Sequence, residues 1–250
     1  LVLYAWRTSR IGLGGGFEPV SRESLLLANN VLLAAAGGTV FLGTLYPLAI
    51  DALGAGKISV GPAYFEAVFV PLMAPALFLM GVGPLARWKR TSLPELAVLL
   101  RWALGISIVL GLMLPFALGE WHALVGFGLA LAIWIVITAV LSFKKTLSHT
   151  RSHYGMALAH IGVAVFVVGV TLVKGYESHD DVRLKPGESA SLAGYAFRLD
   201  EVSTVRGPNY VAARGHISAT RDGKAVTTLY PERRIYTVQE QVMTEAAIDP

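Results

Sequence analysis

A single histidine, His160, lies inside a long apolar run, and its type and position point most directly to chemistry. From Tyr154 to Val173, about 20 residues contain no Lys, Arg, Asp or Glu, which is the length that an α-helix needs to cross a hydrocarbon core of about 30 Å. An ionisable side chain inside such a helix is costly unless it is functional or paired. A neutral imidazole is also the usual axial ligand of haem iron. His160 is therefore either a cofactor ligand or a hydrogen-bonding group between helices.

The spacing of small residues defines two sides of this helix. Three glycines recur at an interval of seven and form a stripe: Gly155, Gly162 and Gly169. His160 points nearly the opposite way, with Ala157 and Ala164 below and above it on its own side. We expect the two alanines to leave room for a flat ligand. We expect the glycines to let a neighbouring helix approach closely from behind.

The composition is that of a membrane protein. Hydrophobic residues make up 54% of the 250 residues and charged residues 15%, which is unlike a soluble domain. The absence of cysteine excludes thiol redox chemistry, disulfides and covalent haem attachment to this chain. The net charge of +4 sits beside the apolar segments, so it indicates membrane topology rather than nucleic-acid binding.

Five apolar segments predict the elements that position His160. The expected transmembrane domain covers residues 24–175, with spans at about 25–50, 64–85, 94–118, 123–143 and 154–173. Residues 1–23 are expected to form the end of a preceding span and a cytoplasmic loop. This start predicts a piece of a longer protein or one product of a split gene.

Basic residues predict the orientation of these spans. They gather on alternate loops, at Arg7, Arg10, Arg22, Arg87, Lys89, Arg90, Lys144, Lys145 and Arg151, whereas the opposite short loops hold only Lys57. By the positive-inside rule the first set faces the cytoplasm. We therefore expect a multi-pass protein of the bacterial inner membrane, with everything after Lys174 in the periplasm.

Residues 176–250 change pattern and predict a small periplasmic β domain. Strands are expected over Ser191–Val202, Val211–Thr220 and Ala225–Tyr230, and Arg221–Lys224 has the composition of a hairpin turn. The predicted fold class is an α-helical polytopic membrane protein, with about five transmembrane helices here and this small β domain.

Several stretches resemble the C-terminal half of the CcmF/NrfE haem lyase family of cytochrome c-type biogenesis proteins, and they follow one another in the same order as in that family. They are Phe17–Leu33, Gly43–Leu48, Ser152–Gly162, Arg221–Lys224, Leu229–Tyr236 and Met243–Asp249. The resemblance implies a haem-handling subunit that binds haem b in the membrane. It also implies help in transferring a transient substrate haem to apocytochrome c, with thioether bond formation. In the family, the histidine of the motif matched here by AHIG is an axial ligand of haem b, and that position is His160.

The resemblance also implies partners and an enzyme class. The partners are a haem chaperone (CcmE-like), apocytochrome c with its presenting subunits (CcmH/CcmI-like), membrane lipid and the missing N-terminal half of the same protein, but no nucleic acid. The class is a cytochrome c haem lyase acting as part of a complex. The family's tryptophan-rich WWD segment, second haem b ligand and outer histidines are absent, so this segment alone is expected to be inactive and its catalytic residues are unknown.

Three further side chains are weaker candidates for the haem site. His153 lies seven residues before His160, either as an interfacial histidine or near a haem propionate. Arg233 and Arg234 either bind propionates, which arginine forks match, or form a solvated strand end. Two other functions stay open, a membrane transporter or channel subunit and a quinol-linked haem b electron carrier.

Overall fold

The structure is a computed structural model that describes Trp6 and residues 18–56, 58–145, 151–237 and 242–248. Most of the expected loop at 1–23, including Arg7 and Arg10, and Lys57 therefore lie outside the described residues. The chain divides into two units, Leu1–Gly175 and Tyr176–Pro250.

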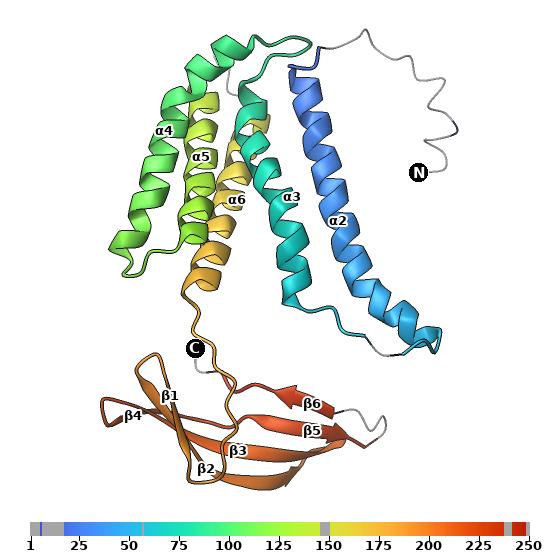
Figure 1. Ribbon diagram of the computed structural model, residues 1–250, viewed down its shortest axis with the longest axis vertical. Coiled ribbons are helices and arrows are strands. Elements are labelled where there is room, and N and C mark those ends of the chain that lie inside the picture. Colours follow the sequence, from blue (N-terminus) through green and yellow to red (C-terminus); the bar gives the residue numbers. More distant parts are fainter. Residues whose placement is uncertain (1–5, 7–17, 57, 146–150, 238–241, 249–250) are drawn as a thin grey trace. The chain divides into compact units, whose positions relative to one another are not determined.

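Five long helices dominate the described part of the first unit (Figure 1). They are α2 (Arg22–Ala52), α3 (Pro62–Val82), α4 (Leu93–Ala117), α5 (Ala123–Lys145) and α6 (Arg151–Tyr176), and a short 3-10 helix, η2 (Gly83–Leu85), follows α3. All five are long and apolar enough to cross a membrane. The helical part of the predicted fold class is therefore confirmed.

One end of the helical unit, called here the basic end, brings together residues 18–23, residues 83–92, the end of α5 and the start of α6 (Figure 1). Main-chain bonds join its first two segments, because Glu18 donates to the carbonyl of Lys89 and Arg22 to that of Arg87. Lys89 has a positive φ of 63°, and its N–H donates to a Glu23 carboxylate oxygen at 2.7 Å. The described basic residues that the sequence placed on one side of the membrane therefore lie at one end.

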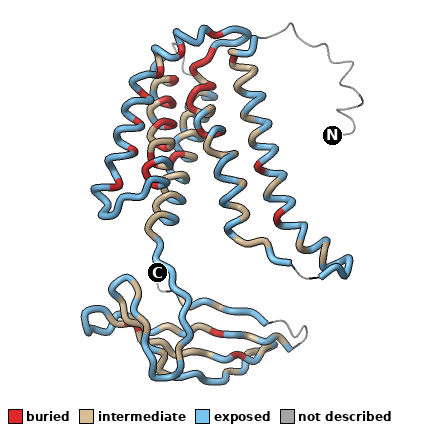
Figure 2. Tube along the Cα trace, viewed as in Figure 1, coloured by how far each residue is buried: buried red, intermediate tan, exposed pale blue. Residues whose placement is uncertain are grey.

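A narrow seam holds α4 against α5. The buried residues of α4 recur every three or four positions, at Leu96, Leu100, Ala103, Ser107, Gly111 and Pro115. At Gly111 the helices are so close that a Cβ atom would lie 2.6 Å from the Cα of Ala130. The remaining sides of α4 are exposed (Figure 2), as expected for a helix whose other surface faces lipid.

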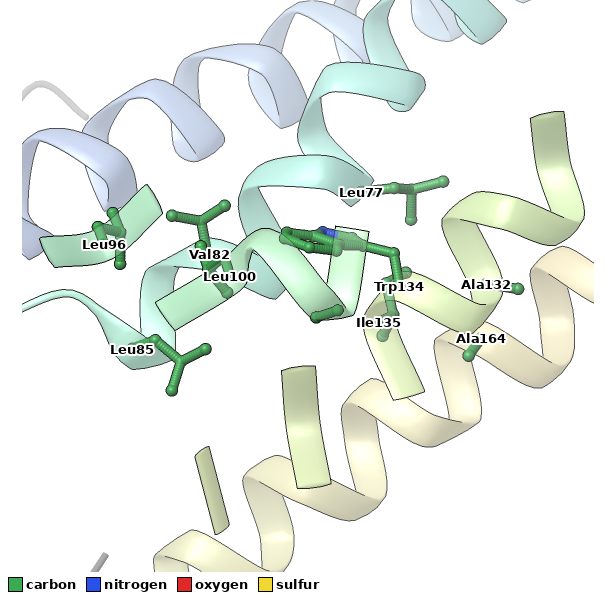
Figure 3. Packing of buried hydrophobic residues seen from close by; sticks show 10 residues of the cluster. Leu77, Val82, Leu85, Leu96, Leu100, Ala132, Trp134, Ile135 and Ala164 are labelled. Atoms are coloured by element: carbon green, nitrogen blue, oxygen red, sulfur yellow. The ribbon is translucent and has the colours of Figure 1, made fainter. Parts of the chain in front are cut away.

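Trp134 of α5 lies at the centre of the buried cluster (Figure 3). Its ring stacks on Phe78 of α3 with centroids 5.1 Å apart, and its indole N–H donates to the Phe78 carbonyl at 3.0 Å. Ile135, beside it, is fully buried. Helix α5 therefore forms the centre around which α3, α4 and α6 pack.

The second unit contains one curled antiparallel sheet in the order β1-β2-β3-β5-β6, with β4 also paired to β3. The strands are β1 (Ser189–Leu192), β2 (Tyr195–Arg206), β3 (Tyr210–Arg221), β4 (Lys224–Leu229), β5 (Glu232–Tyr236) and β6 (Val242–Glu245). The predicted hairpin between β3 and β4 is confirmed, since Asp222 and Gly223 both have positive φ. The β part of the fold class is likewise confirmed.

The single strand expected over Ser191–Val202 is wrong. The chain reverses between β1 and β2 at Ala193 and Gly194, which have φ values of 51° and 81°. Two successive residues in this conformation form the turn that joins short hairpins. Ala-Gly is a weaker signal for that turn than Asn-Gly or Asp-Gly. The alternating pattern therefore predicted one continuous strand across it.

Candidate functional site

Helix α6 fixes the imidazole of His160 through its own backbone. The Nδ1 atom lies 2.7 Å from the carbonyl oxygen of Met156, one turn earlier. Because a carbonyl only accepts, Nδ1 donates this hydrogen bond, and in the neutral imidazole the unprotonated nitrogen is then Nε2. Nε2 has no hydrogen-bond partner among the described residues. In this tautomer Nε2 can donate its lone pair to a metal.

The packed side of α6 includes His160, and the glycine stripe lies on the exposed side. His160, Ala157 and Val167 are half-buried, whereas a Cβ atom added at Gly155, Gly162 or Gly169 would meet no atom within 4 Å in the described part of the chain. The two sides are thus opposite, as predicted. However, no described helix packs against the glycines, so the expectation of a close neighbour there is not met within this chain.

Ala164 does not leave the space that its size suggested. It is only 2% exposed and belongs to the buried cluster that includes Ala132, Trp134 and Ile135. A small residue at this position lets α6 approach α5, which fills the gap (Figure 3). The flat open surface expected on both sides of His160 is therefore wrong on the Ala164 side, whereas Ala157 remains only half-buried.

Contacts along the whole of α6 hold it in register with its neighbours. At the basic end Tyr154 meets Phe143 of α5, with ring centroids 5.1 Å apart. At the other end Thr171 packs against Gly128 of α5, and Lys174 pairs with Glu66 of α3 at 2.9 Å. The position of His160 is therefore set by packing on both sides of it rather than by a loop.

His153 shares the side of α6 that carries His160 and is half-buried. Seven residues of helix place it about 10 Å away along the axis. The structure thus keeps the two histidines on one side of the helix but two turns apart.

Arg233 and Arg234 are not brought together. Adjacent residues of β5 point to opposite faces of the sheet, and Arg233 is exposed. Arg234 pairs with Glu232 at 2.7 Å and Glu245 at 3.2 Å, and its guanidinium lies 4.4 Å from the ring centroid of Tyr210. Arg234 is committed to the sheet, so the two arginines do not form one anion-binding pair.

Glu232 is the buried centre of this ion network. Its side chain is 6% exposed and also pairs with Arg214. Hydrogen bonds from Arg234 and Arg214 hold the pKa of the Glu232 carboxyl below its ordinary value, and the same pairing raises the pKa of Arg234. The network pins β3, β5 and β6 to one another.

A second polar cluster, which the sequence did not predict, surrounds Asp200. This residue lies where the register of β2 shifts between Leu199 and Glu201. Its carboxylate accepts hydrogen bonds from the Ser218 hydroxyl and, at 3.0 Å, from Nδ1 of His216. The Ser218 bond and then the His216 bond lower the pKa of Asp200. No local sequence signal joins residues that lie 16 or 18 positions apart.

Comparisons with known proteins place these features in a family context. Residues 175–250 match the family model described as the CcmF C-terminal beta-sandwich. The chain is 41% identical to the cytochrome c-type biogenesis protein CcmF of Pseudomonas aeruginosa, over all of this chain and 39% of the relative. It is 42% identical to the protein of that name from Escherichia coli, with the same two coverages. It is 34% identical to NrfE of Haemophilus influenzae, over 93% of this chain and 37% of the relative.

A solved structure, that of the cytochrome c heme lyase CcmF, has the same fold. The TM-score is 0.63 at 24% identity, over 91% of this chain and 37% of that one. The chain spans about two fifths of the length of the curated relatives it matches, and the match is to their C-terminal part. The fold described above is thus the fold of that part.

Proposed function

Because this chain belongs to the CcmF family of cytochrome c-type biogenesis proteins, we propose that its helical unit holds a haem b in the membrane and serves cytochrome c maturation. His160 supplies one axial imidazole from α6. The second axial ligand comes from a helix outside this chain. Bound haem iron supplies one-electron redox chemistry, and the residues described here hold and orient its ligand.

The observation that carries the proposal is the hydrogen bond from Nδ1 of His160 to the Met156 carbonyl. Metal-ligating histidines almost always donate their other ring N–H to a carbonyl or carboxylate, which fixes the tautomer and raises the basicity of the ligand. A histidine that merely joined two helices through Nε2 would need an acceptor or donor there, and the described residues offer none.

His153 is not the second axial ligand in this proposal. His153 and His160 lie on one side of one helix, about 10 Å apart along its axis, which is too far for both imidazoles to hold one iron. A place near a propionate at the membrane boundary suits His153 better. Arg233, exposed on the β sheet, is available to an acidic group of a partner or a propionate, and Arg234 is not.

The proposed setting is the bacterial inner membrane, with the basic end in the cytoplasm and the β unit in the periplasm. There the complete protein would act as a haem lyase within a complex. It would receive substrate haem from a haem chaperone and meet apocytochrome c with its presenting subunits. The relatives are cytochrome c-type biogenesis proteins, which favours this assembly role over a transporter, a channel or a quinol-linked carrier.

Replacing His160 tests the proposal. In the complete protein, His160→Ala should abolish haem b absorption and stop cytochrome c maturation while the polypeptide accumulates. Added imidazole should restore part of the absorption, because it can occupy the emptied coordination position. Leu158→Ala, on the exposed side of the same helix, is the matched control and should keep the spectrum.

His153→Ala separates the two histidines and should lower haem retention without removing the low-spin spectrum. A His160→Ala protein that purified with unaltered haem content and spectrum would remove the central assignment. Unaltered haem content with normal maturation after substitution of both histidines would remove the haem role of α6 altogether.

A further inference from the structure

An amphipathic pocket of about 290 Å³ lies at the basic end of the helical unit. Arg87 and Lys145 line its polar part together with Glu95, and Val98 and Leu99 contribute to its apolar part. The pocket is built where the loop before α4 meets the end of α5. Arg87 lies in that loop, Glu95 in the first turn of α4 and Lys145 at the end of α5, whereas Val98 and Leu99 lie one turn further along α4.

The frame of this pocket is fixed by Thr91. Its hydroxyl donates to the carbonyl of Arg87 at 3.1 Å and accepts from the N–H of the same residue at 2.8 Å. Thr91 itself is 9% exposed. The loop that carries Arg87 is therefore closed on itself, and the cation projects from an ordered turn.

The charges of the pocket do not cancel. Arg87 and Glu95 approach to 3.4 Å, but their side chains are 71% and 62% exposed, so solvent screens this pair strongly. Lys145 adds a second cation, which leaves the pocket with one net positive charge. A ligand with an anionic group can therefore pair with Lys145 and share Arg87 with Glu95.

A third cation lies on the same side of α4. Arg101 follows Val98 by three residues, so both side chains occupy one side of the helix. It is exposed, about 12 Å from the helix start, and its guanidinium lies 5.5 Å from the ring centroid of Trp102. No carboxylate pairs with Arg101 among the described residues. Helical side chains lean toward the N-terminus, so this one extends toward the pocket.

We propose that this pocket binds the phosphate-bearing headgroup of an anionic phospholipid. The phosphate lies between Arg87 and Lys145, and an acyl chain follows the exposed apolar side of α4 past Val98 and Trp102, which are 58% and 69% exposed. Basic pockets between membrane helices on the cytoplasmic side bind anionic lipid headgroups. A soluble phosphate would leave the apolar part of the pocket unused. The site is independent of His160.

Lipid binding to the purified protein tests the site. Native mass spectrometry in mild detergent, during titration with phosphatidylglycerol, phosphatidylcholine or inorganic phosphate, gives the affinity of each. The double variant Arg87→Gln with Lys145→Gln should weaken phosphatidylglycerol binding about tenfold. The matched double variant Lys89→Gln with Arg90→Gln removes the same charge from the same end outside the pocket, and should weaken it less than about twofold.

Glu95→Gln should tighten phosphatidylglycerol binding about threefold, because it removes a carboxylate that repels the phosphate. A misfolded variant would not gain affinity, so this result would separate a true site from a folding defect. Equal losses in the two double variants would reduce the effect to general surface charge and overturn the site. Equal binding of phosphatidylcholine would overturn the anionic headgroup. Displacement of the lipid by millimolar inorganic phosphate would identify a free-anion site instead and overturn the lipid.

Discussion

At the scale of the residue, Glu232 shows how one buried carboxylate can hold several strands. Two guanidiniums share it, and one of them also reaches Glu245 on β6. Removing one member of such a network leaves the others desolvated and unpaired. The ion pairs of Glu232 therefore stabilise the β sheet more than the exposed ion pairs of the basic end stabilise the helical unit.

Substitution of this carboxylate should loosen the sheet. We expect Glu232→Gln to speed amide hydrogen exchange in β3, β5 and β6, because Arg214 and Arg234 lose their shared anion. The matched variant Glu201→Gln, on the exposed part of β2, should leave exchange unchanged. Equal protection in Glu232→Gln and the unaltered protein would show that the network contributes nothing to stability.

Acid should weaken the same sheet. The pKa values of Asp200 and Glu232 lie below their ordinary values of 3.8 and 4.5. A carboxyl whose pKa is lowered by folding stabilises the folded state above its ordinary pKa, and this stabilisation is lost as the pH falls through the lowered pKa. Exchange in β2, β3 and β5, corrected for its intrinsic pH dependence, should therefore accelerate below about pH 4. In Glu232→Gln this acceleration should be smaller.

The sequence indicated which residues were important more readily than it indicated which residues they contact. His160 was recognisable from its apolar surroundings, but its bond to Met156 depends on a side-chain rotamer that no sequence pattern reports. The alternation of strand residues already separates Arg233 from Arg234, provided that β5 is recognised as a strand. Asp200 gave no signal at all, because its partners belong to another strand.

At the scale of the element, the seam between α4 and α5 depends on a glycine, Gly111, whose lack of a side chain lets the two helices approach closely. We expect Gly111→Ala to destabilise the helical unit by about 1–3 kcal/mol, because its methyl group would overlap the backbone of Ala130. Gly105→Ala is the control on the same helix, since nothing lies within 4 Å of that position among the described residues. Unfolding in denaturing detergent, followed by tryptophan fluorescence, measures both. Equal stability of the two variants would contradict the close packing.

The long apolar helices were predictable because mean hydropathy over about 20 residues is little affected by single polar residues. Strands are shorter, and a two-residue turn decides their limits. Ala193 and Gly194 broke one expected strand, and β5 was hidden by its charged sequence. Its inward charges are tolerated only because they neutralise one another, which is a property of the assembled sheet.

At the scale of the whole molecule, the gathering of cations at one end predicts the orientation in the membrane. The absence of native cysteine allows single cysteines to be introduced without background. In intact spheroplasts, an impermeant thiol reagent should label the Ser203→Cys variant and spare the Ser92→Cys variant, which lies at the basic end. The reverse pattern would invert the proposed topology.

Most of the surface of α2 is left uncovered by the other described helices. Only Ala36 and Gly43 of this 31-residue helix are buried. The amide oxygen of Asn29 is shielded from solvent without a hydrogen-bond partner among the described residues. The chain covers about two fifths of its relatives' length, and we expect further helices or lipid to cover the exposed sides of α2.

The bond from His160 to Met156 has a consequence for how the site tolerates change over time. Its acceptor is a main-chain carbonyl, so every residue that keeps the helix intact supplies it equally well. Met156 can drift to Leu or Ile while the imidazole keeps its orientation, and only distortion of the helix at this turn would release it. The geometry of the helix therefore sets the orientation of the proposed ligand. A substitution at Met156 that looks severe in an alignment can leave the haem absorption spectrum unchanged.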